Sequence, residues 1–302
     1  MNKIFKVIWS KSKQCYIVVS EVAKNHSGKK KIVVASILAA MAVGGTLNVS
    51  ASTYKWGADA YAALNAIALG DNTHSGSGGS IALGHNAAAQ GTDFTPPGGK
   101  KTNDPSIAIG DHASAEGNAS VSIGYKAVIS QKSYAVAVGR EAEVEGDYGV
   151  SIGYNTRSAQ DGTAVGEQAR SKKQGATALG VSSRGYSQGG VAIGWQSLAG
   201  ANVYTAGVPG SDINKDNETD ITNYGKWGDV AIGLRAMATG GNATAVGRSA
   251  NATEANAIAI GGGDEYDYPG TERGKHFTTA SGKSSVAVGS YAKATEENAM
   301  AL

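Results

Sequence analysis

Residues 106–117 read SIAIGDHASAEG, and the tetrapeptide within them, Ile107–Gly110, decides the fold. A tetrapeptide of the same type, [IVT]-[AS]-[ILV]-Gly, recurs through the chain, and most spacings between its glycines are 14 residues. A fixed period of this length predicts a solenoid in which every copy forms one turn. The repeat glycines are Gly70, Gly84, Gly110, Gly124, Gly139, Gly153, Gly166, Gly180, Gly194, Gly233, Gly247, Gly261 and Gly289.

The residues before each glycine alternate between the two faces of a short strand. A β-branched or other apolar residue stands three and one positions before the glycine, so these two side chains share one face. The residue between them is Ala or Ser in every copy, as at Ala108 and Ser122. A strand that is buried on both faces has this pattern. We expect identical chains, packed around an axis, to cover the alanine face; the alternative is that alanine is merely tolerated there.

A second short strand follows each glycine turn. Small residues stand three and usually five positions after the glycine, as Ala113 and Ala115 do after Gly110, and polar residues such as Asp111 fill the turn. Each copy is therefore predicted to stack in parallel on the next at about 4.8 Å. The expected fold is all-β, a parallel roll of 14-residue repeats with a core one side-chain layer thick.

The composition excludes several other classes of protein. The 302 residues include 43 Gly but only 3 Phe, too few large side chains for the thick core of an ordinary globular enzyme. Glycine has no three-residue period, which excludes collagen. The histidines form no HExxH motif, and the Gly-rich stretches lack phosphate-binding patterns. We therefore expect no catalytic residues and no cofactor, and we interpret His85 and His112 as ordinary surface residues on turns.

The first 51 residues have the pattern of an export signal. Three lysines at 29–31 precede the apolar run 32–43, and small residues allow cleavage after Ala51. The run is too short to span a bilayer well, so we expect a cleaved helical signal segment over 29–51, preceded by an extension over 1–28. Without this basic leader the chain is mildly acidic and has no cysteine, so neither a nucleic-acid partner nor a disulfide is expected.

Two parts of the sequence resemble one family. Residues 1–9, MNKIFKVIW, and 18–21, VVSE, resemble the extended signal peptide region of Gram-negative autotransporters. SIAIGDHASAEG, together with GVAIGWQSLAG at 190–200, resembles the head repeats of YadA-like trimeric autotransporter adhesins. This resemblance runs over 67–302, after a lead-in at 52–66.

The resemblance implies a left-handed parallel β-roll in a homotrimer that is exported to the bacterial outer membrane and cell surface. It implies partners among host extracellular-matrix proteins, host cell-surface receptors or further copies of the protein. The stalk and the C-terminal barrel anchor of the family are absent from this sequence, so we expect an N-terminal fragment or a truncated gene.

Three insertions interrupt the repeats, near 92–103, 201–226 and 262–279. Loops on a rigid scaffold commonly carry binding residues, so the insertions are candidate receptor sites. The second insertion also contains a weak calcium-loop pattern, which lacks the usual glycine and closing glutamate; its candidate ligands are Asp212, Asn214, Asp216 and Asp220. The alternative interpretation is a solvated polar loop, and a calcium titration without heat would exclude the metal.

The predicted function is adhesion without turnover, either to host matrix and cells or between bacteria. One alternative is a structural protein of a biofilm or surface layer, built from the same repeats. A remote alternative is a left-handed β-helix acyltransferase, whose hexapeptide repeats look similar. Those repeats advance by six residues, whereas the copies here advance by 14, which is not a multiple of six.

Overall fold

The computed structural model describes residues 5–10, 15–20, 53–91, 104–200, 227–263 and 277–302. The chain divides into two units, Met1–Ser50 and Ala51–Leu302. In the first unit, β1 (Phe5–Ser10) and β2 (Cys15–Ser20) pair as an antiparallel hairpin. The signal helix expected over the apolar run and the cleavage site after Ala51 lie outside the described residues, so both stay predictions. Across the described ranges, no helix has the length and apolar character needed to cross a membrane.

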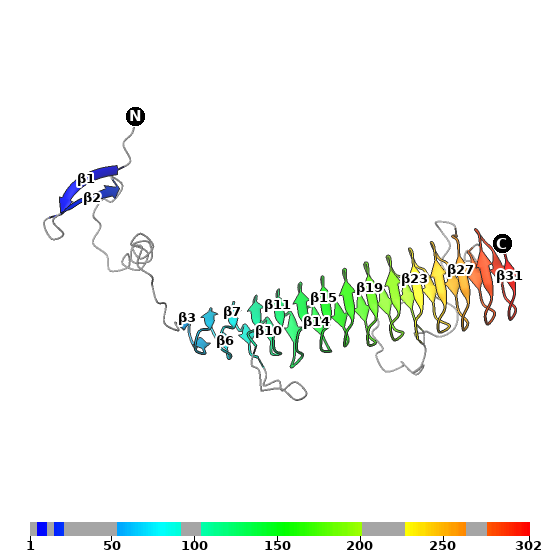
Figure 1. Cartoon of the computed structure of the whole chain (residues 1–302), viewed down its shortest axis with the longest axis horizontal. Helices are drawn as coiled ribbons and strands as arrows, with labels where there is room; N and C mark the ends of the chain where they lie inside the picture. Colours follow the sequence, from blue (N-terminus) through cyan, green and yellow to red (C-terminus); the bar gives the residue numbers. More distant parts are fainter. Residues whose placement is uncertain (1–4, 11–14, 21–52, 92–103, 201–226, 264–276) are drawn as a thin grey trace. The chain divides into compact units, whose positions relative to one another are not determined.

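The second unit consists of two parallel sheets that run side by side along a column (Figure 1). The strands that precede the glycines form one of them, the long-strand sheet. Its members, in order, are β3 (Tyr54–Trp56), β5 (Ile67–Leu69), β7 (Ile81–Leu83), β9 (Ile107–Ile109), β11 (Val121–Ile123), β13 (Val136–Val138), β15 (Val150–Ile152), β17 (Thr163–Val165), β19 (Thr177–Leu179), β21 (Val191–Ile193), β23 (Val230–Ile232), β25 (Thr244–Val246), β27 (Ile258–Ile260), β29 (Val286–Val288) and β31 (Met300–Ala301).

The strands that follow the glycine turns form the short-strand sheet, in which every strand has two residues. Its members are β4 (Tyr61–Ala62), β6 (His74–Ser75), β8 (Ala88–Ala89), β10 (Ser114–Ala115), β12 (Val128–Ile129), β14 (Glu143–Val144), β16 (Arg157–Ser158), β18 (Arg170–Ser171), β20 (Arg184–Gly185), β22 (Leu198–Ala199), β24 (Met237–Ala238), β26 (Asn251–Ala252), β28 (Thr279–Ala280) and β30 (Lys293–Ala294). Each repeat supplies one strand to each sheet, which confirms the predicted parallel all-β roll.

The register keeps equivalent residues of successive repeats side by side. Ala108, for example, pairs with Ala82 on one side and with Ser122 on the other. The column begins earlier than the repeat pattern indicates, because β3 and β4, within the predicted lead-in 52–66, already pair with β5 and β6. Lys55 stands at the alanine position of this first turn and is exposed, as expected for a turn that caps a stack.

Alanine fills most of the space between the two sheets. The central alanines of the long strands, such as Ala108 and Ala137, are completely buried, and so are Ala113 and Ala115 from the turn and the short strand. This burial corrects the expectation that identical chains cover the alanine face. The short-strand sheet of the same chain covers it, because the second strands of successive repeats stack into a continuous sheet of their own.

Serine replaces alanine at the central position of two long strands, and in each case its hydroxyl has a backbone carbonyl as acceptor, in the same repeat for Ser122 and in the preceding repeat for Ser151. Ser122 donates a hydrogen bond from Oγ to the carbonyl oxygen of Ala127 at 2.8 Å. Ser151 donates in the same way to the carbonyl oxygen of Glu143 at 2.7 Å. A buried hydroxyl with a partner costs little, whereas one without a partner would destabilise the core.

The turns that follow the repeat glycines form one edge of the column, which we name the glycine edge. All thirteen repeat glycines have φ between 116° and 154°, a region that other residues rarely adopt. Successive turns also approach closely: a Cβ on Gly124 would lie 2.4 Å from the carbonyl oxygen of Gly139. Glycine is therefore required there for both its backbone conformation and its lack of a side chain.

Substitution of one repeat glycine is expected to destabilise the column strongly. In Gly139→Ala, the new Cβ would lie 2.3 Å from the carbonyl oxygen of Gly153, at a φ of 134°. We expect the free energy of unfolding to fall by about 4 kcal/mol, from backbone strain and overpacking together. Urea denaturation followed by circular dichroism, at a fixed protein concentration, measures this loss.

Gly189→Ala is the matched control. Gly189 has a φ of 65°, and its added Cβ would have no atom within 4 Å. The left-handed conformation alone should cost about 1 kcal/mol. Equal losses of unfolding free energy in Gly139→Ala and Gly189→Ala would contradict the close approach between turns.

Candidate functional site

The outer face of the long-strand sheet is apolar along the whole column. From Ile67 to Val288, the first and third residues of every long strand are Ile, Leu, Val or Thr, without a charged residue among them. Most of these side chains are partly exposed, and Leu69, Ile152 and Ile260 are about two-fifths exposed. A contiguous, partly exposed apolar strip of this length marks a contact surface.

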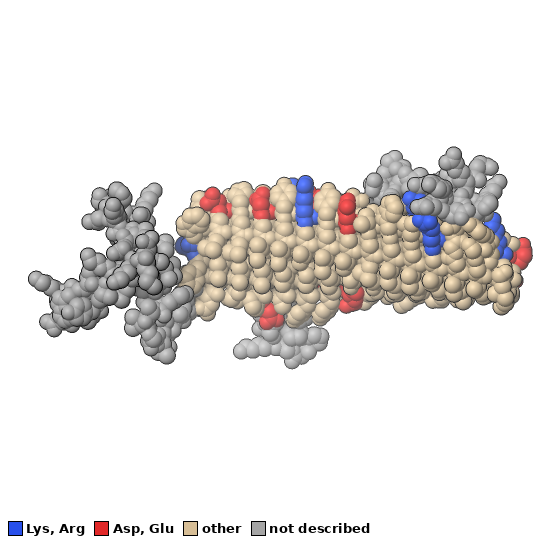
Figure 2. Space-filling view, turned by 90° about the horizontal axis from the view of Figure 1, so that it is seen from above, with Lys and Arg blue, Asp and Glu red and all other residues tan. Residues whose placement is uncertain are grey.

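The outer face of the short-strand sheet differs from copy to copy. The first residue of each short strand occupies it, and these residues are Tyr61, His74, Ala88, Ser114, Val128, Glu143, Arg157, Arg170, Arg184, Leu198, Met237, Asn251, Thr279 and Lys293. In the view of Figure 2, uncharged residues form a band along the described column, and most of the Lys, Arg, Asp and Glu residues in sight lie towards its margins. The two sheets thus present one uniform and one varied surface.

A charged stretch lies in the middle of the short-strand face. Arg157, Arg170 and Arg184 stand in register on three successive strands. Glu143, one strand earlier, forms an ion pair with Arg157, with Oε2 and Nε 3.1 Å apart. Arg170 and Arg184 are almost completely buried, so the exposed charges of this stretch are those of Glu143 and Arg157.

Aromatic and cationic side chains alternate along the glycine edge. The Arg140 guanidinium lies 5.5 Å from the ring centre of Tyr125 and 5.6 Å from that of Tyr154. Arg235 lies 5.3 Å from the ring centre of Trp195. The three rings are between 40% and 49% exposed. Exposed aromatic rings held by cations can bind flat apolar or cationic groups of a partner.

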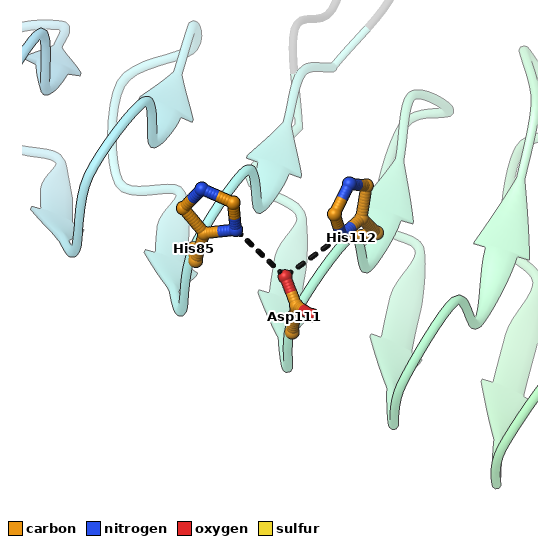
Figure 3. A group of neighbouring side chains, drawn as sticks. All are labelled: His85, Asp111 and His112. Carbon is orange, nitrogen blue, oxygen red and sulfur yellow. Dashed lines mark hydrogen bonds and ion pairs between the residues drawn. The ribbon is translucent and has the colours of Figure 1, made fainter.

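The same edge brings together two histidines and an aspartate from neighbouring turns (Figure 3). The Nδ1 atoms of His85 and His112 lie 3.0 Å and 2.7 Å from Oδ1 of Asp111. All three side chains are exposed, by 55%, 47% and 44% respectively. The side-chain amide nitrogen of Asn86 lies 3.2 Å from Nε2 of His112. A carboxylate oxygen between two imidazole nitrogens is a compact donor set.

The histidines alter the acidity of the carboxylate between them. The hydrogen bond from His85 lowers the pKa of the Asp111 carboxyl below its ordinary value, and the hydrogen bond from His112 acts in the same direction. Desolvation opposes this shift. A lowered pKa means that ionised Asp111 favours the folded state, and that this contribution is lost as the pH falls through the folded-state pKa.

Sequence reasoning placed His85 and His112 correctly on turns but missed that they are neighbours. The residues between them include the insertion 92–103, so the spacing of 27 residues hides the fact that β7 and β9 pair directly. Alignment of the repeat glycines Gly84 and Gly110 gives the signal, since the histidines stand one and two residues after them.

The insertions and the calcium pattern lie largely outside the described residues. The insertions at 92–103 and 201–226 follow the short strands β8 and β22, whereas residues 264–276 follow the long strand β27. Thr279, at the end of the third predicted insertion, already belongs to β28. Asp212, Asn214, Asp216 and Asp220 are outside the description, so the calcium loop stays a prediction.

The fold and its surfaces define a rigid β-solenoid that presents varied side chains on a repeated frame. Comparisons with known proteins give the family. The YadA head domain repeat matches residues 62–87, 77–93, 102–127, 131–156, 158–183, 238–263 and 280–302, which together make up more than half of the chain. The chain belongs to the YadA-like trimeric autotransporter adhesin family.

The leader agrees with this assignment. Residues 1–49 match the Extended Signal Peptide of Type V secretion system, so the protein is exported to the outer membrane and cell surface. The chain is also 35% identical over 104 residues to the autotransporter adhesin EhaG of Escherichia coli O157:H7. That match covers 30% of this chain and 6% of EhaG, so the chain corresponds to a small part of that relative.

The lowered pKa of Asp111 gives a test of the histidine–aspartate geometry. In His85→Gln, we expect the pKa of the Asp111 carboxyl to rise towards its ordinary value, because the largest cause of the shift is removed. Carboxyl carbon shifts followed by NMR during an acid titration measure this change. A control variant, His74→Gln, removes a histidine that stacks on Tyr61 instead. An Asp111 pKa that moves equally in both variants, or in neither, would contradict the geometry.

Proposed function

We propose that this chain is the head of a homotrimeric surface adhesin that attaches bacteria to host extracellular-matrix proteins or cell-surface receptors, or to one another. The observation that carries the proposal is the unbroken apolar outer face of the long-strand sheet in a member of this family. The mechanism requires no turnover: a rigid column presents the same weak binding surfaces several times at once.

The apolar face supports the homotrimer. The alanine layer is already complete within one chain, so the Ile, Leu, Val and Thr residues on the outer face have no role in closing the column. These residues recur at the same height in every turn, which suits a symmetric partner with the same repeat. Closed cyclic symmetry buries such a face on every chain and leaves no copy of it unpaired.

The trimer would leave the other surfaces facing outwards. The short-strand face, with the ion pair of Glu143 and Arg157, and the aromatic residues of the glycine edge would then appear three times on each head. Multivalent contact raises the overall affinity far above that of one site. The insertions lie largely outside the described residues, and we include them in the proposed binding surface because loops on a repeated frame commonly carry binding residues.

A lysine on the apolar face should separate the chains. In Val136→Lys, threefold symmetry would bring three like charges into one interface, and like charges brought together cost several kcal/mol. We expect the molar mass in sedimentation equilibrium to fall from that of three chains to that of one. The column itself should keep its circular dichroism, because Val136 lies outside the alanine layer.

Val128→Lys is the matched control, since Val128 lies on the outer face of the short-strand sheet and is also partly buried. It should leave the trimer intact. Dissociation by Val128→Lys but not by Val136→Lys would place the interface on the short-strand sheet and contradict the proposed interface. A natural chain that is monomeric would contradict the trimer itself.

Adhesion can be measured with beads that carry the purified chain. We expect beads with the natural chain to bind immobilised matrix proteins or cultured epithelial cells, or to clump together. Beads with monomeric Val136→Lys, at the same chain density, should lose at least tenfold in retention, because the three sites of a head are no longer held together.

The two arms of the bead assay separate the kinds of partner. Binding to matrix or cells without clumping would identify a host-directed adhesin, and clumping alone would identify self-association. Beads that do neither would contradict the adhesin function, while the trimer would still stand on its own measurement.

A further inference from the structure

The cluster of His85, Asp111 and His112 on the glycine edge is not needed by either the core or the apolar face. Its three ligand atoms lie within 4.8 Å of one another. The distances from Oδ1 of Asp111 to the two Nδ1 atoms, 3.0 Å and 2.7 Å, are close to the separation of about 3.3 Å that two ligands at 2.0 Å have on a tetrahedral ion. Small side-chain rotations therefore suffice to place all three around one ion.

We propose that His85, Asp111 and His112 bind a divalent transition-metal ion of the zinc class. Imidazole nitrogens suit Zn²⁺, Ni²⁺ and Cu²⁺, whereas Ca²⁺ and Mg²⁺ prefer a set made of oxygen atoms. Two imidazoles with one carboxylate give three protein ligands and leave the remaining positions to water or to a donor from another molecule. The exposure of all three side chains keeps those positions open to solvent.

The backbone holds the three residues in place before an ion arrives. The amide of His112 donates a hydrogen bond to the carbonyl oxygen of His85 at 2.9 Å, which ties one turn to the next. The amide of Asn86 donates in the same way to the carbonyl oxygen of Asp71 at 2.9 Å. A site whose backbone is fixed in advance loses less entropy when it binds.

Asn86 is suited to a positioning role. The nitrogen of its side-chain amide lies 3.2 Å from Nε2 of His112, the ring nitrogen that does not contact Asp111. When Nδ1 of His112 binds the ion, the ring proton must reside on Nε2, and the Asn86 side chain can turn its oxygen towards that proton. A partner of this kind fixes the tautomer of a metal-bound histidine.

Titration calorimetry of the metal-free purified chain with ZnCl₂ tests the proposal. We expect saturable binding of one Zn²⁺ per chain that His112→Gln weakens at least tenfold. Glutamine already occupies the same turn position, with a similar positive φ, at Gln168 and Gln196, so this variant should fold normally. Asp111→Asn should also weaken binding at least tenfold, since it removes the only charged ligand.

His74→Gln provides the control, because His74 lies on the outer short-strand face and stacks on Tyr61; it should leave the affinity unchanged. Asn86→Ser should weaken binding while the thermal stability of the metal-free chain stays the same, and serine already occupies this position at Ser182 and Ser249.

Two results would overturn the metal site. One is the absence of saturable zinc binding to the natural chain. The other is zinc binding that persists in both His112→Gln and Asp111→Asn, or that His74→Gln removes equally, since the ion would then lie elsewhere. Ring ¹⁵N shifts of His85 and His112 during the titration distinguish direct ligation from a distant effect.

Discussion

The whole column depends on how closely successive turns approach each other at the glycine edge. A Cβ on Gly110 would lie 2.5 Å from the carbonyl oxygen of Gly124, a distance that no side chain allows. Successive turns therefore stack directly on one another, and each turn leads the second strand back over the first. The space between the two sheets is filled mostly by alanine, with Ile129 and Val144 as larger side chains on two neighbouring short strands. The glycine of the turn and the small residues of the core together keep each repeat short.

Much of this frame could be predicted from the sequence. The spacing of the glycines gives the number of residues in a turn, and the alternation of Ile107, Ala108 and Ile109 gives the two faces of the strand. What covers Ala108 could not be predicted in the same way. The alternation shows that a side chain is buried, but it does not show whether the covering layer comes from another chain or from residues only a few positions further along.

The histidine–aspartate cluster shows a second limit of sequence reasoning. Neighbours in a solenoid are separated by one turn, and an insertion lengthens that turn without moving its ends apart. The insertion at 92–103 therefore separates His85 from His112 in the sequence while β7 and β9 stay paired. Residues in a repeat protein are better compared by their distance from the nearest repeat glycine than by their distance from each other.

Backbone hydrogen bonds, glycine and alanine hold each turn, so the outward side chains are free to differ without loss of the fold. On the short-strand face and along the glycine edge they do differ, from Val128 to Glu143 to Arg157 on successive strands. The apolar residues of the long-strand face have the same freedom and do not use it. A surface that is uniform where the chain itself demands nothing supports the proposal that its partner has the same period, as another copy of the chain does.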